Sequence, residues 1–101
     1  MPVRAELTMT VPVPRAESFV TEWRKVAGWV ATLPGCLRQT LSQVRQGDSD
    51  TFVITSDWVD RSTYEHFEHS SRQDAATADL RALRTSVAMR VLTIVDHVEN
   101  R

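Results

Sequence analysis

The hydrophobic pattern changes its period within one stretch, residues 52–71, and this change constrains the fold more than any other feature. Before the change, alternate residues share one face of a predicted buried strand. They are Phe52, Ile54, Ser56 and Trp58. Asp60 is a residue type that commonly caps helix N-termini. After it, the residues at helical spacing are Tyr64, Phe67 and Ser71. A helix from Asp60 to Ser71 therefore follows the strand directly, and we expect Trp58 and Tyr64 to converge on one cavity.

The N-terminal third predicts a strand followed by a long helix. Residues 3–11 alternate apolar and polar side chains, which is typical of a strand with one buried face. Prolines at positions 12 and 14 end this strand, because proline cannot donate to a sheet ladder. From about Arg15 to Leu33, apolar residues at spacings of three and four predict an amphipathic helix that Pro34-Gly35 ends. Trp29 lies at the flank of the apolar stripe, where it either covers the core edge or lies at a pocket mouth or a partner subunit.

A hairpin is predicted in the middle of the chain. Residues 37–45 and 51–59 read as strands, and the polar loop between them contains a Gly-Asp pair. Leu37, Gln39, Leu41 and Gln43 should share one face, and Thr40, Ser42 and Val44 the other. Neither face is wholly apolar. A polar pocket on one side and a partner subunit on the other would suit this composition.

The last third completes the fold class. Residues 74–85 predict a second helical segment with Ala76, Leu80 and Leu83 inward, and Val87, Met89, Val91, Thr93 and Val95 alternate as a last strand. The order βαββαβ is typical of a ferredoxin-like α+β domain, with two helices on one face of a four-stranded antiparallel sheet. A chain of 101 residues suffices for one such domain, residues 1–101.

Charge and composition exclude several classes of partner. A formal net charge of -1, with arginines spread among acids, provides no electrostatic footprint for nucleic acid. No apolar run approaches the roughly 20 residues of a membrane span, and the N-terminus lacks the order of a signal peptide. The lone Cys36 cannot form an internal disulfide, which suits a reducing compartment. We therefore expect a cytoplasmic protein without nucleic-acid or membrane partners.

Metal and nucleophile motifs are not recognisable. His66, His69 and His97 form no pair at ligand spacing, and the first two should lie on the solvated side of their helix. Cys36 has no adjacent His or Lys to activate its thiol. The three glycines are isolated, so no phosphate-binding loop is predicted. We expect no metal site and no bound cofactor.

The chain resembles the antibiotic biosynthesis monooxygenase family of dimeric α/β barrels. The resemblance rests on the opening strand, Trp58 at a strand end, an aromatic in the next helix, Pro34-Gly35, and the segment Ala78-Asp79-Leu80-Arg81. It implies a homodimer that oxidises a small aromatic substrate without a cofactor. The resemblance assigns catalytic roles to Trp58, Tyr64 and Arg81, and substrate binding to Ile54, Ser56, Phe67, Arg84 and Trp29. Which of the two arginines reaches the pocket stays open. Heme-degrading relatives share this fold, but Phe67 and Ala76 stand where they carry a Trp and a heme-ligating His.

In such an oxygenase, a deprotonated phenol or anthrone itself gives an electron to oxygen, while the protein excludes water and stabilises the oxyanion. Trp58 and Tyr64 offer donors, and a guanidinium lowers the pKa of a nearby phenol. Ile54, however, occupies the position where oxygenase members place an Asn, and Ser56 would substitute only in part. Two alternatives remain: a polyketide cyclase or isomerase, in which Tyr64, Ser56 or a histidine moves protons, and a non-catalytic small-ligand module.

Overall fold

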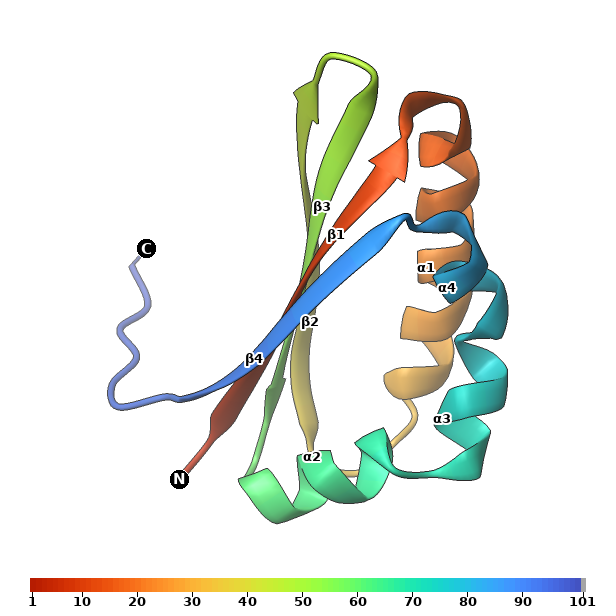
Figure 1. Ribbon diagram of the computed structural model, residues 1–101. Coiled ribbons are helices and arrows are strands. Elements are labelled where there is room, and N and C mark those ends of the chain that lie inside the picture. Colours follow the sequence, from red (N-terminus) through yellow and green to blue (C-terminus); the bar gives the residue numbers. More distant parts are fainter. Residues whose placement is uncertain (101) are drawn as a thin grey trace.

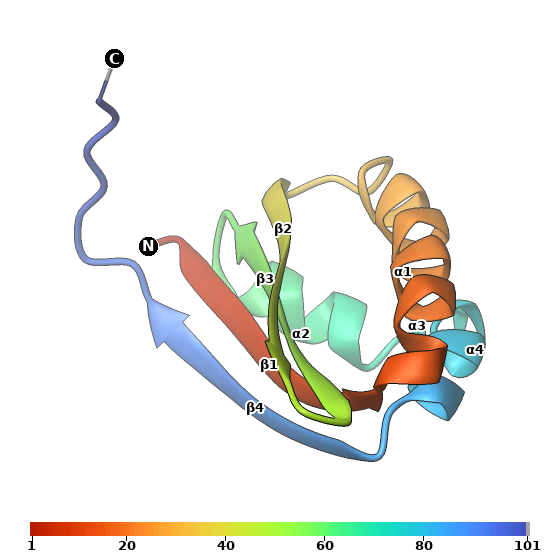
Figure 2. The ribbon, with the colours of Figure 1, turned by 90° about the horizontal axis from the view of Figure 1, so that it is seen from above.

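The computed structural model describes residues 1–100. Its elements are β1 (Val3–Pro12), a 3₁₀ turn (Val13–Arg15), α1 (Ala16–Val30), β2 (Cys36–Gln46), β3 (Ser49–Trp58), α2 (Arg61–Glu68), α3 (Ser71–Ala76), α4 (Ala78–Leu83) and β4 (Ser86–Thr93). The strands form one antiparallel sheet in the order β2-β3-β1-β4. The helices cover one face of this sheet (Figures 1 and 2). The predicted ferredoxin-like α+β fold is confirmed.

The core lies between β1, β3 and α1, as the alternation in the first strand predicts. Val3, Ala5, Met9 and Val11 are buried along β1. Phe19 of α1 stacks on Phe52 of β3, with ring centroids 4.6 Å apart. Such a stacked pair adds about 0.5–1.5 kcal/mol to the burial of its two rings. This contact positions α1 over the centre of the sheet.

The turn after α1 depends on Gly35. The helix ends at Val30, earlier than the predicted Leu33, and hydrogen-bonded turns follow it. Gly35 has φ of +90°, and a Cβ at this position would lie 2.5 Å from Cγ2 of Thr63. Glycine thus permits both the backbone conformation and the close approach of α2, whose entry is also held by the bond from Val59 N–H to the Gly35 carbonyl at 2.9 Å.

A bulge at the start of β2 changes the predicted pattern of that strand. Cys36 pairs with Trp58 and Arg38 with Asp57, so Leu37 is an extra residue in the ladder. Leu37 is consequently exposed, and the prediction that it shares a face with Leu41 is wrong. Gln39 does face the helices, where its Nε2 donates to the Ala27 carbonyl at 3.0 Å.

The helical region between β3 and β4 consists of three short helices instead of the predicted two. Asp60 does cap α2, because its side chain accepts a bond from Thr63 N–H at 2.7 Å. Ser70 caps α3 in the same way, so Ser71 begins a new helix and is exposed. A further break at Thr77 separates α3 from α4, and Ala76 is exposed, not inward as predicted. Leu80 is buried and Leu83 half-buried, whereas Val95 lies beyond the end of β4.

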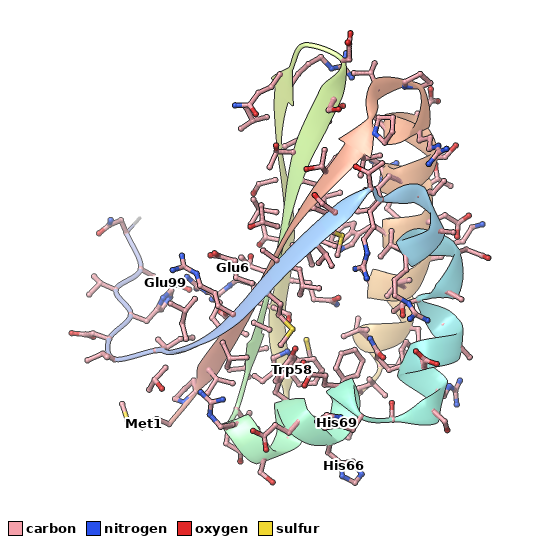
Figure 3. The ribbon with its side chains drawn as sticks, viewed as in Figure 1. Met1, Glu6, Trp58, His66, His69 and Glu99 are labelled. Atoms are coloured by element: carbon pink, nitrogen blue, oxygen red, sulfur yellow. The ribbon has the colours of Figure 1, made fainter. Side chains whose placement is uncertain are left out.

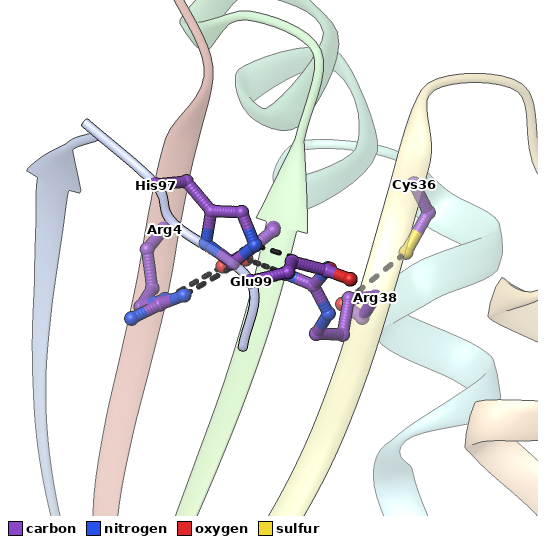
Figure 4. Close-up of polar contacts among 6 residues, drawn as sticks. Arg4, Cys36, Arg38, His97 and Glu99 are labelled. Atoms are coloured by element: carbon purple, nitrogen blue, oxygen red, sulfur yellow. Dashed lines mark hydrogen bonds and ion pairs between the residues drawn. The ribbon is translucent and has the colours of Figure 1, made fainter. Parts of the chain in front are cut away.

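An ion-pair network occupies the face of the sheet that the helices leave uncovered. Asp57 is 3% exposed and accepts bonds from Arg4 at 2.7 and 2.9 Å and from Arg38 at 3.0 Å. Arg38 also contacts Glu99, which lies 3.2 Å from His97 (Figure 4). The Arg4 guanidinium holds the pKa of the Asp57 carboxyl below its usual range, with a smaller contribution from Arg38. The network joins β1, β2, β3 and the C-terminal segment.

No helix within residues 1–100 is long and apolar enough to cross a membrane.

Candidate active site

A cavity of about 240 Å³ lies between the helix-covered face of the sheet and the helices. Its walls are formed by Leu7, Met9, Trp23, Val26, Val30, Gln39, Ile54, Ser56, Trp58, Tyr64, Phe67, Glu68, Gln73, Thr77, Leu80, Arg81, Arg84 and Met89. All the residues that the sequence proposes for a site contribute to this wall except Trp29. His66 and His69 lie outside it and are exposed, as predicted (Figure 3).

Three aromatic rings form one side of this cavity. Trp58 and Tyr64 meet edge to face with centroids 5.8 Å apart, so their predicted convergence is confirmed. Phe67 stacks on Trp58 at 4.8 Å. The cause is local: β3 passes into α2 within two residues, and Tyr64 and Phe67 then share the inward side of that helix. These rings provide an apolar, aromatic wall on one side of the cavity.

On the strand side of the cavity, the Trp58 indole is hydrogen-bonded to Ser56, and the Ser56 hydroxyl keeps its own proton available. The Trp58 side chain is 1% exposed, and its Nε1–H donates to Ser56 Oγ at 2.9 Å. Within the described part of the chain, the Ser56 hydroxyl has no acceptor for its own proton. Ser56 can therefore donate that proton to a ligand in the cavity.

Tyr64 is paired with a residue that the sequence reasoning missed. Its hydroxyl donates to Oε2 of Glu68 at 2.8 Å and lies 3.7 Å from the Met89 sulfur. Burial raises the pKa of Tyr64 far above its ordinary value, and the bond to Glu68 raises it further. Tyr64 is therefore neutral. The spacing of four residues on one helix was the available signal for this pair.

Both candidate arginines line the cavity. Arg81 donates from Nη2 to the Asp74 carbonyl at 2.7 Å and lies 3.0 Å from the Asp74 carboxylate. The Arg81 Nε is buried without a hydrogen-bond partner in residues 1–100. Burial lowers the pKa of Arg84, and the charge of Arg81 lowers it further. Two neighbouring cations at one cavity wall favour a ligand with developing negative charge.

Ile54 presents only an apolar side chain, but an amide lies on the adjacent strand. Gln39 pairs with Ser56 across the ladder and Leu41 with Ile54. One Gln39 amide N–H is bound to Ala27, which leaves its oxygen and a second N–H for the cavity. The sequence predicts that Gln39 shares a strand face with Leu41, but it does not place Gln39 in the site. The register of the strand decides which face of the sheet its side chains occupy.

Trp29 belongs to a second, more open cavity of about 470 Å³. Its ring lies 5.9 Å from Phe67, and the Arg72 guanidinium lies 5.6 Å from the centroid of Trp29. Trp58 and Phe67 line both cavities. Trp29 therefore does not line the first cavity, its substrate-binding role stays a prediction, and Phe67 forms part of the partition between the two spaces.

The described residues contain no group of three or more His, Cys, Asp or Glu side chains that could hold a metal ion. Burial raises the pKa of the Cys36 thiol, which disfavours the nucleophilic thiolate.

The fold and the cavity together define a ferredoxin-like α+β domain with an aromatic chamber between its sheet and its helices. The sequence profile of the family described as antibiotic biosynthesis monooxygenase matches residues 2–79, and the chain belongs to this family.

Several solved structures are similar to this fold. A variant of SnoaB, a cofactor-independent oxygenase from Streptomyces nogalater, has a TM-score of 0.82 at 23% identity, with 98% of each chain covered. Rv0793 from Mycobacterium tuberculosis has a TM-score of 0.77 at 19% identity, covering 98% of this chain and 100% of its own. A conserved protein from Methanosarcina mazei Go1 has a TM-score of 0.78 at 11% identity, covering 90% of each chain. At these identities the likeness concerns the fold. No curated protein sequence matches the chain.

Proposed function

We propose that this protein is a cofactor-independent monooxygenase that oxidises a polycyclic aromatic or polyketide-type substrate, an anthrone or phenol, to a quinone in natural-product biosynthesis. Family membership supports oxygenase chemistry. The observation that carries the proposal is the cavity itself, in which three packed rings face two arginines and a free serine hydroxyl. An electron-rich aromatic ligand would pack against the rings, and its anion would be stabilised by the two arginines.

The proposed reaction begins with loss of a proton from the substrate. Arg81 and Arg84 lower the pKa of the bound phenol or enol, because they favour its anion. The anion then gives an electron to molecular oxygen, and the resulting radicals combine at the benzylic carbon. Loss of water completes the conversion, so that an anthrone and O₂ yield a quinone and water. Exclusion of solvent protects the radical pair and strengthens each electrostatic contact.

The cavity groups have separate proposed roles. Ser56 donates to the substrate oxyanion, Trp58 holds the Ser56 hydroxyl in place, and Phe67 stacks on the ring system. Gln39 provides the amide that Ile54 cannot provide. Groups fixed before reaction stabilise developing charge without reorganising during the step.

The decisive experiment uses purified protein free of flavin, heme and metal, with a model anthrone as substrate. Quinone should form faster than in buffer, with uptake of O₂, and labelled oxygen should place one atom in the quinone and the other in water. Chelators should not change the rate. A rate equal to that of buffer would contradict the proposal.

A cyclase or isomerase on the same scaffold is the second candidate. The pairing of Tyr64 with Glu68 provides a group that can move protons, and Ile54 provides no amide for an oxygen-binding role. Product formed equally fast under argon, without added mass from oxygen, would replace the oxygenase by this class. Tight binding of an anthrone without any turnover would instead indicate a non-catalytic ligand-binding module.

We also propose that the protein acts as a homodimer in the cytoplasm. The uncovered sheet face carries Thr, Ser and Val side chains in addition to the ion pairs, and Val44 on this face is 57% exposed. A second copy would cover that face symmetrically. The single free Cys36 suits a reducing compartment.

A further inference from the structure

The proton of the Tyr64 hydroxyl is committed within the protein. A tyrosine hydroxyl has one proton to donate, and here it is directed to Glu68 Oε2 at 2.8 Å. The Tyr64 oxygen therefore presents lone pairs to the cavity. In this state it accepts a hydrogen bond from a ligand hydroxyl but cannot donate one to an oxyanion. The site is arranged for a substrate that arrives neutral.

Glu68 lies between the cavity and the solvent. It lines the cavity, and its side chain is 29% exposed. The charged groups that face it are few. His69 Nε2 lies 3.6 Å from Glu68 Oε1 on the same helix, and Arg81 and Arg84 line the cavity from α4 and its C-terminal end. The β4 neighbour, Met89, carries no charge. A proton that reaches Glu68 can thus leave to water without crossing the cavity.

We propose that Tyr64 and Glu68 form a proton relay that removes the hydroxyl proton of a neutral phenol or enol substrate. This inference rests on the proposed function and adds the substrate's protonation state and the proton acceptor. The substrate O–H bond breaks as a new O–H bond forms on Tyr64, and the original Tyr64 O–H bond breaks as an O–H bond forms on Glu68 Oε2. The electron pair stays on the substrate oxygen. No oxidation occurs in this step.

The relay changes what Tyr64 offers to the ligand. Its hydroxyl now carries the substrate's former proton and donates it back to the new oxyanion. Tyr64 remains neutral throughout, in agreement with its strongly raised pKa. The net charge of the site is unchanged, because the negative charge moves from Glu68 to the ligand in the chamber that Arg81 and Arg84 line. Those two cations then stabilise the anion.

The relay can be tested without oxygen by binding 2-hydroxyanthraquinone, whose phenolate absorbs at longer wavelength than its phenol. Under argon, at a pH below the ligand's own pKa, the wild-type protein should bind it as the phenolate. In Glu68→Gln the phenolate band should be lost. Tyr64→Phe should bind the phenol form.

Kinetics provide a second readout that a structural role would not change. Glu68→Gln should lower the rate of anthrone oxidation by about 10²–10⁴-fold and remove the acid limb from the pH profile of kcat/KM. Glu68→Ala should regain rate when formate is added. Glu65→Gln is the matched control, because Glu65 lies on the same helix, is exposed and pairs with Arg61 outside the cavity. It should behave as the wild type.

The outcomes separate the relay from the proposed function. Binding of the ligand as a neutral phenol, or a Glu68→Gln protein that ionises it as the wild type does, would overturn the relay and leave the oxygenase proposal intact. A wild-type protein that neither binds hydroxyaromatics nor oxidises an anthrone would overturn both. If Glu68→Gln fails to fold, the spectrum of the ligand bound to Tyr64→Phe decides, because that variant retains the ring.

Discussion

The indole of Trp58 is hydrogen-bonded to Ser56, two residues earlier on the same face of β3, with Nε1 and Oγ 2.9 Å apart. An indole has a single donor, so in this state Trp58 has none left for a ligand. The expectation that Trp58 donates directly to the oxyanion is therefore replaced by a chain in which Trp58 orients the Ser56 hydroxyl. Changing either residue should therefore weaken the same oxyanion donor.

Ser56→Ala and Trp58→Phe should each slow anthrone oxidation by about 10²–10³-fold, because each removes a part of one oxyanion donor. Ser56→Ala should also cost about 1–3 kcal/mol of stability, since it leaves a buried indole N–H unpaired. Turnover kinetics and thermal melting measure the two effects. Thr55→Ala, on the opposite face of β3, is the control. Additive losses in the double variant would contradict a shared donor.

Leu80→Ala and Tyr64→Phe should differ in their effect on folding. Leu80 is 5% exposed, and its truncation should cost about 2–5 kcal/mol. Tyr64→Phe keeps the ring and loses one hydrogen bond to a carboxylate, which costs about 1.5–3 kcal/mol at most. Chemical denaturation of both variants provides the comparison. If Tyr64→Phe is the less stable protein, its hydroxyl serves the fold and not the site.

The proposed dimer predicts that the protein sediments as a pair of chains at micromolar concentration. Val44→Arg should shift it towards monomer, because the charge would be buried where two sheets meet. Val59→Arg is the matched control, since Val59 is also exposed but lies outside the sheet. A wild-type monomer in sedimentation would reject the dimeric barrel.

Acid should destabilise the protein through Asp57. The pKa of Asp57 is depressed in the folded state, chiefly by its bonds from Arg4. A carboxyl group whose pKa is depressed by folding contributes stability that is present above its unfolded pKa of about 3.9. This stability is lost as the pH falls through the pKa of the folded state. The melting temperature should thus be steady down to about pH 5 and fall below about pH 4.

Asp57→Asn should make that fall shallower, whereas Asp79→Asn, on the exposed side of α4, should not. Some acid sensitivity should persist in Asp57→Asn, because the bond from Arg45 also depresses the pKa of Asp50. An unchanged slope in Asp57→Asn would show that the network does not govern acid stability.

Much of the site followed from neighbouring residues. The alternation in β3, the cap at Asp60 and the helical spacing of Tyr64 and Phe67 are local properties, so the convergence of Trp58 and Tyr64 was predictable. The functional roles of these residues stay predictions. The contact between Tyr64 and Glu68 could also have been predicted, because residues four apart on a helix are neighbours. A glutamate near two histidines, however, is typical of a solvated helix face.

The sequence by itself determined the order of strands and helices, the inward face of β1 and β3, and the ferredoxin-like class, because hydrophobic period is set by local backbone geometry. Tertiary structure decided what local periods cannot: the bulge that exposes Leu37, the break at Thr77 that turns Ala76 outward, and the anchoring of Arg81 by Asp74. The bulge depends on the pairing of two strands, and the anchoring of Arg81 depends on the packing of two helices. Packing overrides residue propensity where a one-residue shift moves a side chain to another face.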